Sequence, residues 1–534
     1  MRPALLVGLL ALSLIPLVVA CGPAPAPSPT AITLRRGLSG EPATLDPASV
    51  TDTFSAEVLR DLYEGLTGEA PDGAVIPGIA QSWEVDASGL HYLFHLRADA
   101  KWSDGTALIA QDFVAAWRRV VDPKQGAADA DLLRIIKGAA AIVSDHAGIE
   151  SLGAVATDEH TLAVTLEQPA PYFPGLLSHA AAYPIRSDAS ARSHDPRTWV
   201  SNGPYVLSSW HPGTSVKLTR NRAYWDIDHV RIDTVTYQFA ADDAAQLRSY
   251  RAGELELTDN VPASDLPALK RDHARELRIA PFLATAYYGI NLTAAPLGQN
   301  LKLRQALAMA IDRKRLVQAL ALGQTEAYGF VPPGTWNYTP QSWEWRNLSD
   351  EERNRKAREL FLEAGITKAI PLKLHLLYNT NPAIRQTAIV IASMWREVLG
   401  IETVFEDQEY RVFLETRHDK SRWQIARLSW GADYDDAGNF LDTLRKNSPN
   451  NDQSYRSDAL DALLDEAAQS PDPALRREKL QAAERKLLAD YPIIPLYHLV
   501  SKRLIKPYVL GADTPNALNH LNSKWLSISA PGGT

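Results

Sequence analysis

Residues 371–436 alternate between two kinds of hydrophobic period, and this alternation restricts the possible folds more than any other feature of the chain. Apolar residues recur at every second position over 372–378, which predicts a strand, and at helical spacing over 384–398, where Gly400 ends the helix. Because successive strands joined through helices run parallel, the segment predicts an α/β fold with helices covering a parallel sheet. The later elements expected here are a strand over 401–405, a helix over 409–417 and a strand over 423–430.

Polar and aromatic residues follow the ends of these strands. Asp433 comes three residues after the third predicted strand, and Asn379 and Tyr410 lie near the ends of the other two. Open parallel sheets bind small molecules just outside the carboxyl ends of their strands. Arg427 lies within the third strand among apolar neighbours, where an arginine needs a partner. We expect a ligand site here, but the residues alone leave open a solvated carboxylate at Asp433, an internal ion pair at Arg427 and a core role for Trp430.

The first thirty residues have the features of an exported, anchored protein. An uncharged apolar stretch over residues 3–20 ends in Val-Val-Ala directly before Cys21, the only cysteine among 534 residues. We predict a signal peptide over 1–20, and the ending resembles a bacterial lipoprotein signal in which Cys21 is acylated. A membrane-spanning helix is the alternative, although Pro16 interrupts it. Residues 21–30 alternate Pro with small residues, which predicts a flexible tether.

Charge and motifs argue against several classes of function. The chain has 55 Lys and Arg against 63 Asp and Glu, a net charge of -8, so nothing favours binding to nucleic acid. The sequence has no His-Glu-x-x-His, Gly-x-Ser-x-Gly or phosphate-binding glycine loop. A calcium loop starting at Asp433 fails because Ala437 and Leu444 replace oxygen ligands. We predict no catalytic residue, metal or cofactor, and at least two lobes, since single cores stop growing at about 250–300 residues.

Several short motifs resemble those of the extracytoplasmic oligopeptide-binding receptors of ABC importers, solute-binding protein family 5. They are Pro-Ala-Thr-Leu-Asp-Pro (42–47), Arg-Asp-Leu-Tyr-Glu-Gly-Leu (60–66), Phe-His-Leu-Arg (94–97), Lys-Trp-Ser-Asp-Gly-Thr (101–106), Asn-Gly-Pro-Tyr (202–205), Tyr-Trp (224–225) and Ala-Ile-Asp-Arg (310–313). The resemblance implies an α/β, periplasmic-binding-protein-like type II fold, with two lobes around a hinge and an extra domain inserted in the N-terminal lobe. It also implies that the protein is not an enzyme.

The same resemblance implies how the chain divides into domains. Domain I would combine residues 31–67, 189–284 and 500–534. Domain II, the insertion, would cover 68–188, and domain III would cover 285–499. Two strands would then cross between the lobes, near Ala284 and Val500, and act as the hinge.

The C-terminal part is similar to the peptide-receptor subgroup in particular, through residues 413–418, 426–427, Trp430 and 432–434. In that subgroup the matching Asp binds the α-ammonium of the peptide, the matching Arg residues bind carboxylates, and the aromatic residues line side-chain pockets. This chain departs from the subgroup at Gly431, which replaces a bulkier residue, and at Ile384, which replaces a polar one in some relatives. The resemblance thus implies ligand contacts at Asp433, Arg427, Arg417, Trp430, Tyr410, Gly431, Ala432 and Asn379.

The resemblance therefore implies a monomeric receptor that captures short peptides for an ABC permease in the inner membrane. It would touch the membrane only through its lipid anchor, on the periplasmic side in a bacterium with two membranes. A sibling receptor for murein tripeptide would use both Arg417 and Arg427 for an acid-rich ligand. An anchored hydrolase of cell-wall peptides and a holdase chaperone are the alternatives from other classes.

Overall fold

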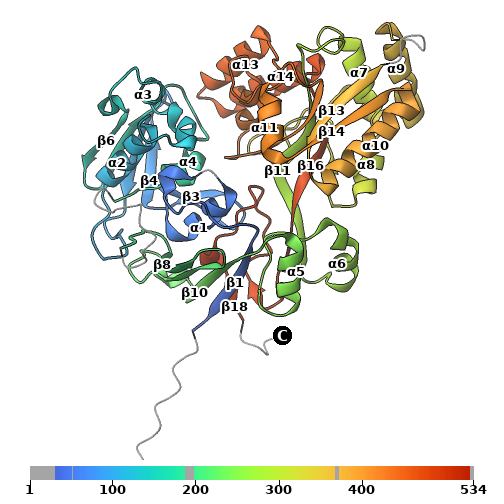
Figure 1. Ribbon diagram of the computed structural model, residues 1–534. Helices are drawn as coiled ribbons and strands as arrows, with labels where there is room; N and C mark the ends of the chain where they lie inside the picture. The colour runs from blue at the N-terminus through green and yellow to red at the C-terminus, as the bar shows by residue number, and fades with distance from the viewer. Residues whose placement is uncertain (1–30, 51, 187–197, 367–371, 530–534) are drawn as a thin grey trace, which may run out of the picture.

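The computed structural model describes residues 31–50, 52–186, 198–366 and 372–529. Two lobes lie side by side and are joined by long strands (Figure 1). The predicted signal peptide, the tether and Cys21 lie outside the described residues. Within the described ranges, no helix has both the length and the apolar character that a membrane crossing requires.

The first lobe contains two four-stranded sheets around one shared core. One sheet has the order β1-β10-β9-β8, and the other has the order β4-β5-β7-β6. β8 and β9 form the hairpin that the Pro212-Gly213 turn predicts within residues 202–220. Buried residues of both sheets belong to the same hydrophobic cluster. Their strands are β1 (Thr33–Leu38), β10 (Thr234–Phe239), β9 (Ser215–Arg220), β8 (Tyr205–His211), β4 (Ala80–Val85), β5 (His91–Leu96), β7 (Thr161–Thr165) and β6 (Ala154–Asp158).

Helices of the first lobe begin and end at sequence signals. The sequence pattern predicts a helix over residues 55–66. The structure has α1 there, which begins at Thr53 because the side chain of Asp52 accepts a hydrogen bond from the Ser55 N–H at 2.8 Å. It ends at Leu62, four residues earlier than predicted. The helices are α1 (Thr53–Leu62), α2 (Ala110–Val121), α3 (Ala139–Val143), α4 (Phe173–Leu176), α5 (Asp243–Arg251) and α6 (Leu266–Asp272), with short strands β2 (Thr67–Glu69) and β3 (Val75–Pro77).

The second lobe is built on a sheet of order β12-β16-β11-β15-β13-β14. β13 runs parallel to both β14 and β15, which confirms the predicted strand-helix-strand-helix-strand unit. Gly400 ends the connecting helix in a left-handed conformation, with φ of 73°, as expected. The elements of the sheet are β12 (Thr325–Glu326), β16 (Ile493–Leu504), β11 (Leu277–Ile290), β15 (Ile425–Gly431), β13 (Lys373–Asn379) and β14 (Glu402–Gln408), with α10 (Pro382–Leu399) and α11 (Tyr410–His418) between strands.

The sequence over 301–320 predicts a helical stretch with few breakers, and the residues are mostly helical but do not form one continuous helix. The structure has two helices there, because the Asp312 side chain accepts from the Arg315 N–H at 2.9 Å and starts a new helix. The two helices are α7 (Leu301–Met309) and α8 (Arg313–Leu320). The other helices of this lobe are α9 (Asp350–Glu363), α12 (Ala437–Leu441), α13 (Asp458–Ala468) and α14 (Pro473–Asp490).

Two strands connect the lobes. β11 and β16 pair in antiparallel fashion from Leu277 opposite Leu504 to Pro281 opposite Val500, and regular pairing resumes only at Thr285 opposite His498. In Figure 1 they run together from the lower part of the molecule into the second lobe. The chain therefore passes between the lobes through a short stretch of irregular pairing, where fewer hydrogen bonds resist bending.

Candidate functional site

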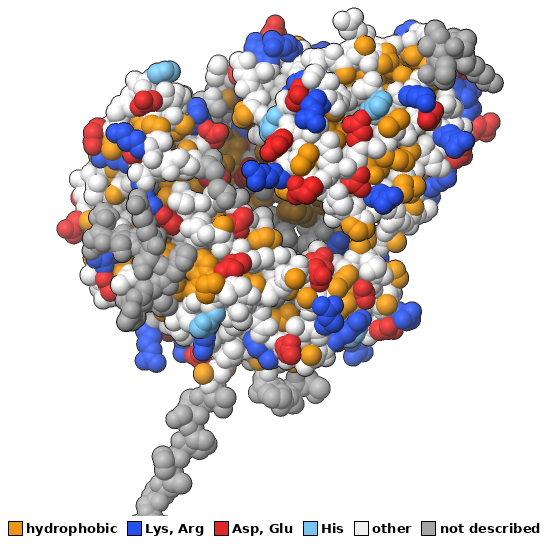
Figure 2. Space-filling view, in the orientation of Figure 1, with side chains coloured by type: hydrophobic (Ala, Val, Ile, Leu, Met, Phe, Trp, Pro, Cys, Tyr) orange, Lys and Arg blue, Asp and Glu red, His pale blue; other side chains and the backbone are white. Residues whose placement is uncertain are grey.

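A cavity of about 380 Å³ lies between the lobes. The space-filling view shows that the surface is hollowed where the lobes meet (Figure 2). The cavity is lined by residues of the first lobe, of the connecting strands β11 and β16, and of the loop that follows β15. Among them are Phe54, Arg60, Asp129, His179, Phe282 and Asp433.

Asp433 is presented to this cavity by the loop after β15. The strand ends at Gly431, one residue later than predicted, so Asp433 is the second residue beyond it. The Asn439 side-chain amide donates to the Asp433 carboxylate at 3.1 Å, and the Asp433 N–H donates back to Asn439 Oδ1 at 3.2 Å. Burial by the cavity walls raises the pKa of Asp433, against the effect of the Asn439 hydrogen bond. Among the described residues Asp433 has no cationic partner, so its charge is available to a ligand.

Asn439 holds the site together, and the sequence interpretation missed it. It lies in α12 and is buried, and its Oδ1 also accepts from the Trp430 indole N–H at 2.9 Å. The start of α12 is anchored by Asp436, whose buried carboxylate accepts two hydrogen bonds from Arg476, at 2.6 and 2.9 Å. In the sequence, Asn439 looks like any asparagine near the start of a helix. Its contacts with Trp430 and Asp433 arise only when the loop folds, so no local pattern indicates them.

Arg427 lies six residues before Asp433, in β15, opposite Tyr288 of β11. It is half-buried, and burial lowers the pKa of its guanidinium, while surrounding tyrosines raise it. In the part of the chain that the structure describes, no carboxylate pairs with the Arg427 guanidinium and no hydrogen bond is made by it. An enclosed charge without a partner is costly. The described residues therefore do not form the internal ion pair that the sequence left open for Arg427. The surrounding tyrosines are Tyr287, Tyr288, Tyr410 and Tyr497.

Arg417 has a different environment. It lies in the last turn of α11, and its Nε is 2.9 Å from the carboxylate of Asp452. Asp452 is buried and also pairs with Lys420 at 3.0 Å. The structure thus places Arg417 in an internal network of charges, whereas Arg427 is left without such a partner.

Most of the other predicted contacts lie near either Asp433 or Arg427. Trp430, Gly431 and Ala432 adjoin Asp433, and the Ala432 N–H donates to the Leu283 carbonyl at 2.8 Å. Tyr410, which is 58% exposed, lies at the start of α11 near Arg427. A Cβ added to Gly431 would lie 3.5 Å from Phe282, so a larger residue is sterically possible there.

Asn379 ends β13, and its side-chain carbonyl is buried without a hydrogen-bond partner among the described residues. Such an oxygen needs a donor. It is therefore the predicted contact that most needs a ligand or a water molecule.

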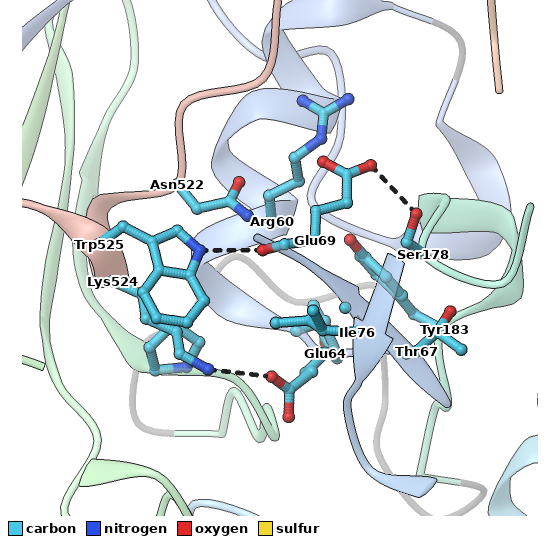
Figure 3. A pocket seen from close by; sticks show the side chains of 14 residues that line it. Arg60, Glu64, Thr67, Glu69, Ile76, Ser178, Tyr183, Asn522, Lys524 and Trp525 are labelled. Carbon is cyan, nitrogen blue, oxygen red and sulfur yellow. Dashed lines mark hydrogen bonds and ion pairs between the residues drawn. The ribbon is translucent and has the colours of Figure 1, made fainter. Parts of the chain in front are cut away.

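A second cavity, of about 40 Å³, lies within the first lobe (Figure 3). Its charges are already paired: Lys524 contacts Glu64 at 3.5 Å, and the Glu69 carboxylate accepts from Ser178 at 3.1 Å and contacts His520 at 2.7 Å. A cavity of this size holds only a few water molecules. We therefore exclude it and assign ligand binding to the interlobe cavity, because two of the predicted contacts, Ala432 and Asp433, line that cavity. Within the described residues, no group of three or more His, Cys, Asp or Glu side chains is arranged to hold a metal ion.

The lobes also touch beside the cavity. Tyr172, just before α4, stacks on Tyr434 with ring centroids 4.7 Å apart and an angle of 12° between the planes. The guanidinium of Arg476 lies 5.1 Å from the Tyr172 ring. Since Tyr434 directly follows Asp433, this stack joins the first lobe to the loop that carries the carboxylate.

We expect Tyr172→Ala to weaken ligand binding by about two- to tenfold, because a stacked aromatic pair contributes about 0.5–1.5 kcal/mol to the form in which the lobes are in contact. Isothermal titration calorimetry would measure the change. Tyr172→Phe keeps the ring and should bind like the unmodified protein. Unchanged affinity in Tyr172→Ala would show that the stack does not favour the bound form.

The comparisons with known proteins now identify the family. The model of the bacterial extracellular solute-binding proteins, family 5 Middle, matches residues 74–452, which is more than half of the chain. The chain belongs to this family. A family 5 solute-binding protein binds its ligand without converting it, so the protein is not an enzyme, and its fold is the periplasmic-binding-protein-like type II fold.

Relatives within family 5 cover nearly the whole chain. The periplasmic oligopeptide-binding protein OppA of Salmonella typhimurium is 36% identical over 504 residues, 93% of this chain and 92% of that protein. The probable deoxycholate-binding periplasmic protein YgiS of Escherichia coli is 35% identical over 521 residues, 96% and 97% of the two chains. The structure of the Escherichia coli murein tripeptide binding protein MppA matches with a TM-score of 0.81 and 32% identity, over 93% of this chain and 99% of that one. These relatives are named for different ligands, so the geometry of the site has to indicate which kind of ligand this chain binds.

Proposed function

We propose that this family 5 solute-binding protein captures short peptides between its lobes and delivers them to an ABC permease. One observation carries the proposal: Asp433 and Arg427 have opposite charges, neither has an ionic partner among the described residues, and Arg427 lies in β15 while Asp433 is the second residue of the loop after it. A peptide has the complementary pair, an ammonium at one end and a carboxylate at the other. At about 3.3 Å per extended residue, six residues separate the Cα atoms of Arg427 and Asp433 by at most about 20 Å.

The ligand would lie extended between the lobes, as an added strand whose main-chain hydrogen bonds do not depend on its sequence. Asp433 would pair with the α-ammonium and Arg427 with a carboxylate, while the unsatisfied Asn379 oxygen would accept a hydrogen bond from the peptide. Bending at the irregular stretch of β11 and β16 would close the lobes over the ligand. Water in roomy side-chain pockets would then allow varied sequences.

The charges favour a plain peptide over the two other ligands named among the relatives. An acid-rich murein tripeptide would need a second free cation, but Arg417 is engaged with Asp452. A bile acid has a carboxylate and no amine, so it would leave Asp433 enclosed and unpaired, which is costly. The murein tripeptide remains the second candidate because MppA is similar over nearly its whole length.

The location of the protein is also part of the proposal. The apolar stretch before Cys21 supports a signal peptide and an acylated cysteine, and the Pro-rich residues 21–30 support a tether. Two acyl chains exceed the single-chain limit at which membrane binding is marginal. The receptor would thus stay near its permease, on the periplasmic side in a bacterium with two membranes, as a monomer.

The test is calorimetry on protein freed of copurified ligand by unfolding and refolding. Alanine peptides of three to five residues should bind, and N-acetylation should weaken them about a hundredfold, because it leaves Asp433 enclosed without a partner. The murein tripeptide and deoxycholate are titrated in parallel. Equal binding of free and acetylated peptides, or tighter binding of either competitor, would contradict the proposal. Mass spectrometry of the recovered peptide should find it intact, whereas cleavage would favour the hydrolase alternative.

A further inference from the structure

Five carboxylates line the interlobe cavity, and they differ in whether the protein itself satisfies them. Asp52 accepts from the Ser55 N–H at 2.8 Å, Glu57 pairs with Arg36, and Asp259 accepts from the Ser39 N–H at 3.3 Å. Among the described residues, Glu57 is the only one of the five with a cationic partner, and Asp52 and Asp259 are satisfied by backbone N–H groups. Asp433 accepts a hydrogen bond from Asn439, whereas Asp129 accepts none from any residue that the structure describes.

Asp129 and Asp433 lie on opposite walls of the cavity. Asp129 belongs to the short helix η2 (Ala128–Ile135) in the first lobe, and Asp433 belongs to the loop after β15 in the second. They are therefore not an acidic cluster on one surface. Burial raises the pKa of Asp129 to about 6, and repulsion by Asp433 and then by Asp131 contributes. Each carboxylate is thus within electrostatic reach of the other across the space that a ligand would fill.

The basic groups that line the cavity are engaged elsewhere or uncharged. Arg60 is hydrogen-bonded to His520 at 2.6 Å, and Arg503 donates to the Asn519 side chain at 2.6 Å. His179 accepts from the Ala181 N–H at 3.2 Å, and burial lowers its pKa to about 3, so it is neutral at physiological pH. Among the described residues neither arginine pairs with Asp129 or Asp433, and neither lowers the pKa of these two carboxylates. A ligand is therefore the source of positive charge that fits both carboxylates.

One α-ammonium supplies one charge, and the proposed function assigns it to Asp433. We propose that Asp129 is a specificity-determining residue that pairs with a cationic side chain on the first residue of the peptide. The receptor then selects peptides that begin with lysine or arginine, because these carry two positive charges at the amino end. This inference rests on the proposed function. It adds a preference for the side chain of the first peptide residue to a site that otherwise recognises only the two ends of the peptide.

The test compares two tripeptides that differ in one charge, lysyl-alanyl-alanine and norleucyl-alanyl-alanine. Their first side chains have the same four-carbon stem, so the ratio of their dissociation constants isolates the ammonium. We expect the unmodified protein to bind the lysyl peptide about tenfold more tightly, as for an enclosed charge pair. Asp129→Asn should reduce this ratio to about one and change the norleucyl affinity by less than twofold. Asp131→Asn, in an exposed neighbour that pairs with Arg134, should retain the tenfold ratio.

Two results would overturn the inference: equal affinities of the unmodified protein for the two peptides, or a tenfold ratio that survives in Asp129→Asn. Asp129→Ser gives the same comparison if the Asn variant does not fold. Failure of the proposed function has a different signature, in which neither peptide binds or the N-acetylated norleucyl peptide binds as well as the free one.

Discussion

Replacing Asp433 by Ala should weaken the binding of a free-amine peptide by about a hundredfold or more. Removing one partner of an enclosed charge pair costs about 3–5 kcal/mol, because the remaining charge stays desolvated, and each 1.4 kcal/mol is a factor of ten in affinity. The Asn439 hydrogen bonds hold the carboxylate in place before the ligand arrives, so little ordering cost offsets the interaction. Calorimetric titration of the variant and the unmodified protein with the same peptide measures the loss.

The same change should leave the fold intact. The pKa of Asp433 is raised in the folded protein, so ionisation at neutral pH opposes folding, and this penalty disappears with the carboxylate. The melting temperature of the empty variant should therefore equal or exceed that of the unmodified protein. Loss of affinity with retained stability is the pattern of a residue that serves ligand binding.

Two comparisons separate the amine contact from a general disturbance of the loop. Asp435→Ala removes a neighbouring carboxylate that accepts from the Trp336 N–H at 2.7 Å, and it should change affinity by less than a few fold. An N-acetylated peptide should bind weakly to both the unmodified protein and Asp433→Ala, with little difference between them. If Asp433→Ala loses the same factor for the acetylated and free peptides, the carboxylate does not recognise the amine.

The sequence predicted the central sheet of the second lobe well because its hydrophobic periods are distinct. Strand period over 372–378 changes to helical period over 384–398, and Gly400 supplies the left-handed residue that ends the helix. The break between α7 and α8 was missed because apolar spacing continues across it, while the cap at Asp312 depends on one side chain. Local periodicity therefore specified the elements better than their ends.

The candidate site was predictable only where its residues come from one segment. Trp430 to Asp433 form the end of β15 and the start of the loop after it, so their position at the sheet edge follows from chain order. Asp129 and Tyr172 reach the same region from the first lobe, and no local pattern connects them to Asp433. Likewise, Arg417 is engaged in an ion pair because Asp452, a residue far along the chain, becomes its neighbour after folding. Pairing between distant residues was thus the information that the sequence patterns lacked.

Arg427→Met should weaken the binding of a peptide with a free carboxylate by about a hundredfold, because it leaves that carboxylate enclosed without a partner. The methionine keeps an apolar stem and removes the charge. Since burial lowers the pKa of Arg427, its charge opposes folding, and the melting temperature of the empty variant should not fall. Titration with a free and a C-terminally amidated peptide measures the effect, and the amidated peptide should bind the variant and the unmodified protein almost equally.

Arg417→Met is the matched control, since it removes the same group ten residues earlier. It deprives the buried Asp452 of one of its cations, at a cost of about 1–3 kcal/mol, so the melting temperature should fall. Its peptide affinity should stay within a few fold, because Arg417 is not free to meet a ligand. The opposite result, lost binding in Arg417→Met and unchanged affinity in Arg427→Met, would reverse the roles of the two arginines. It would also restore the case for an acid-rich murein ligand, because Arg417 would then have to leave Asp452 to reach a carboxylate.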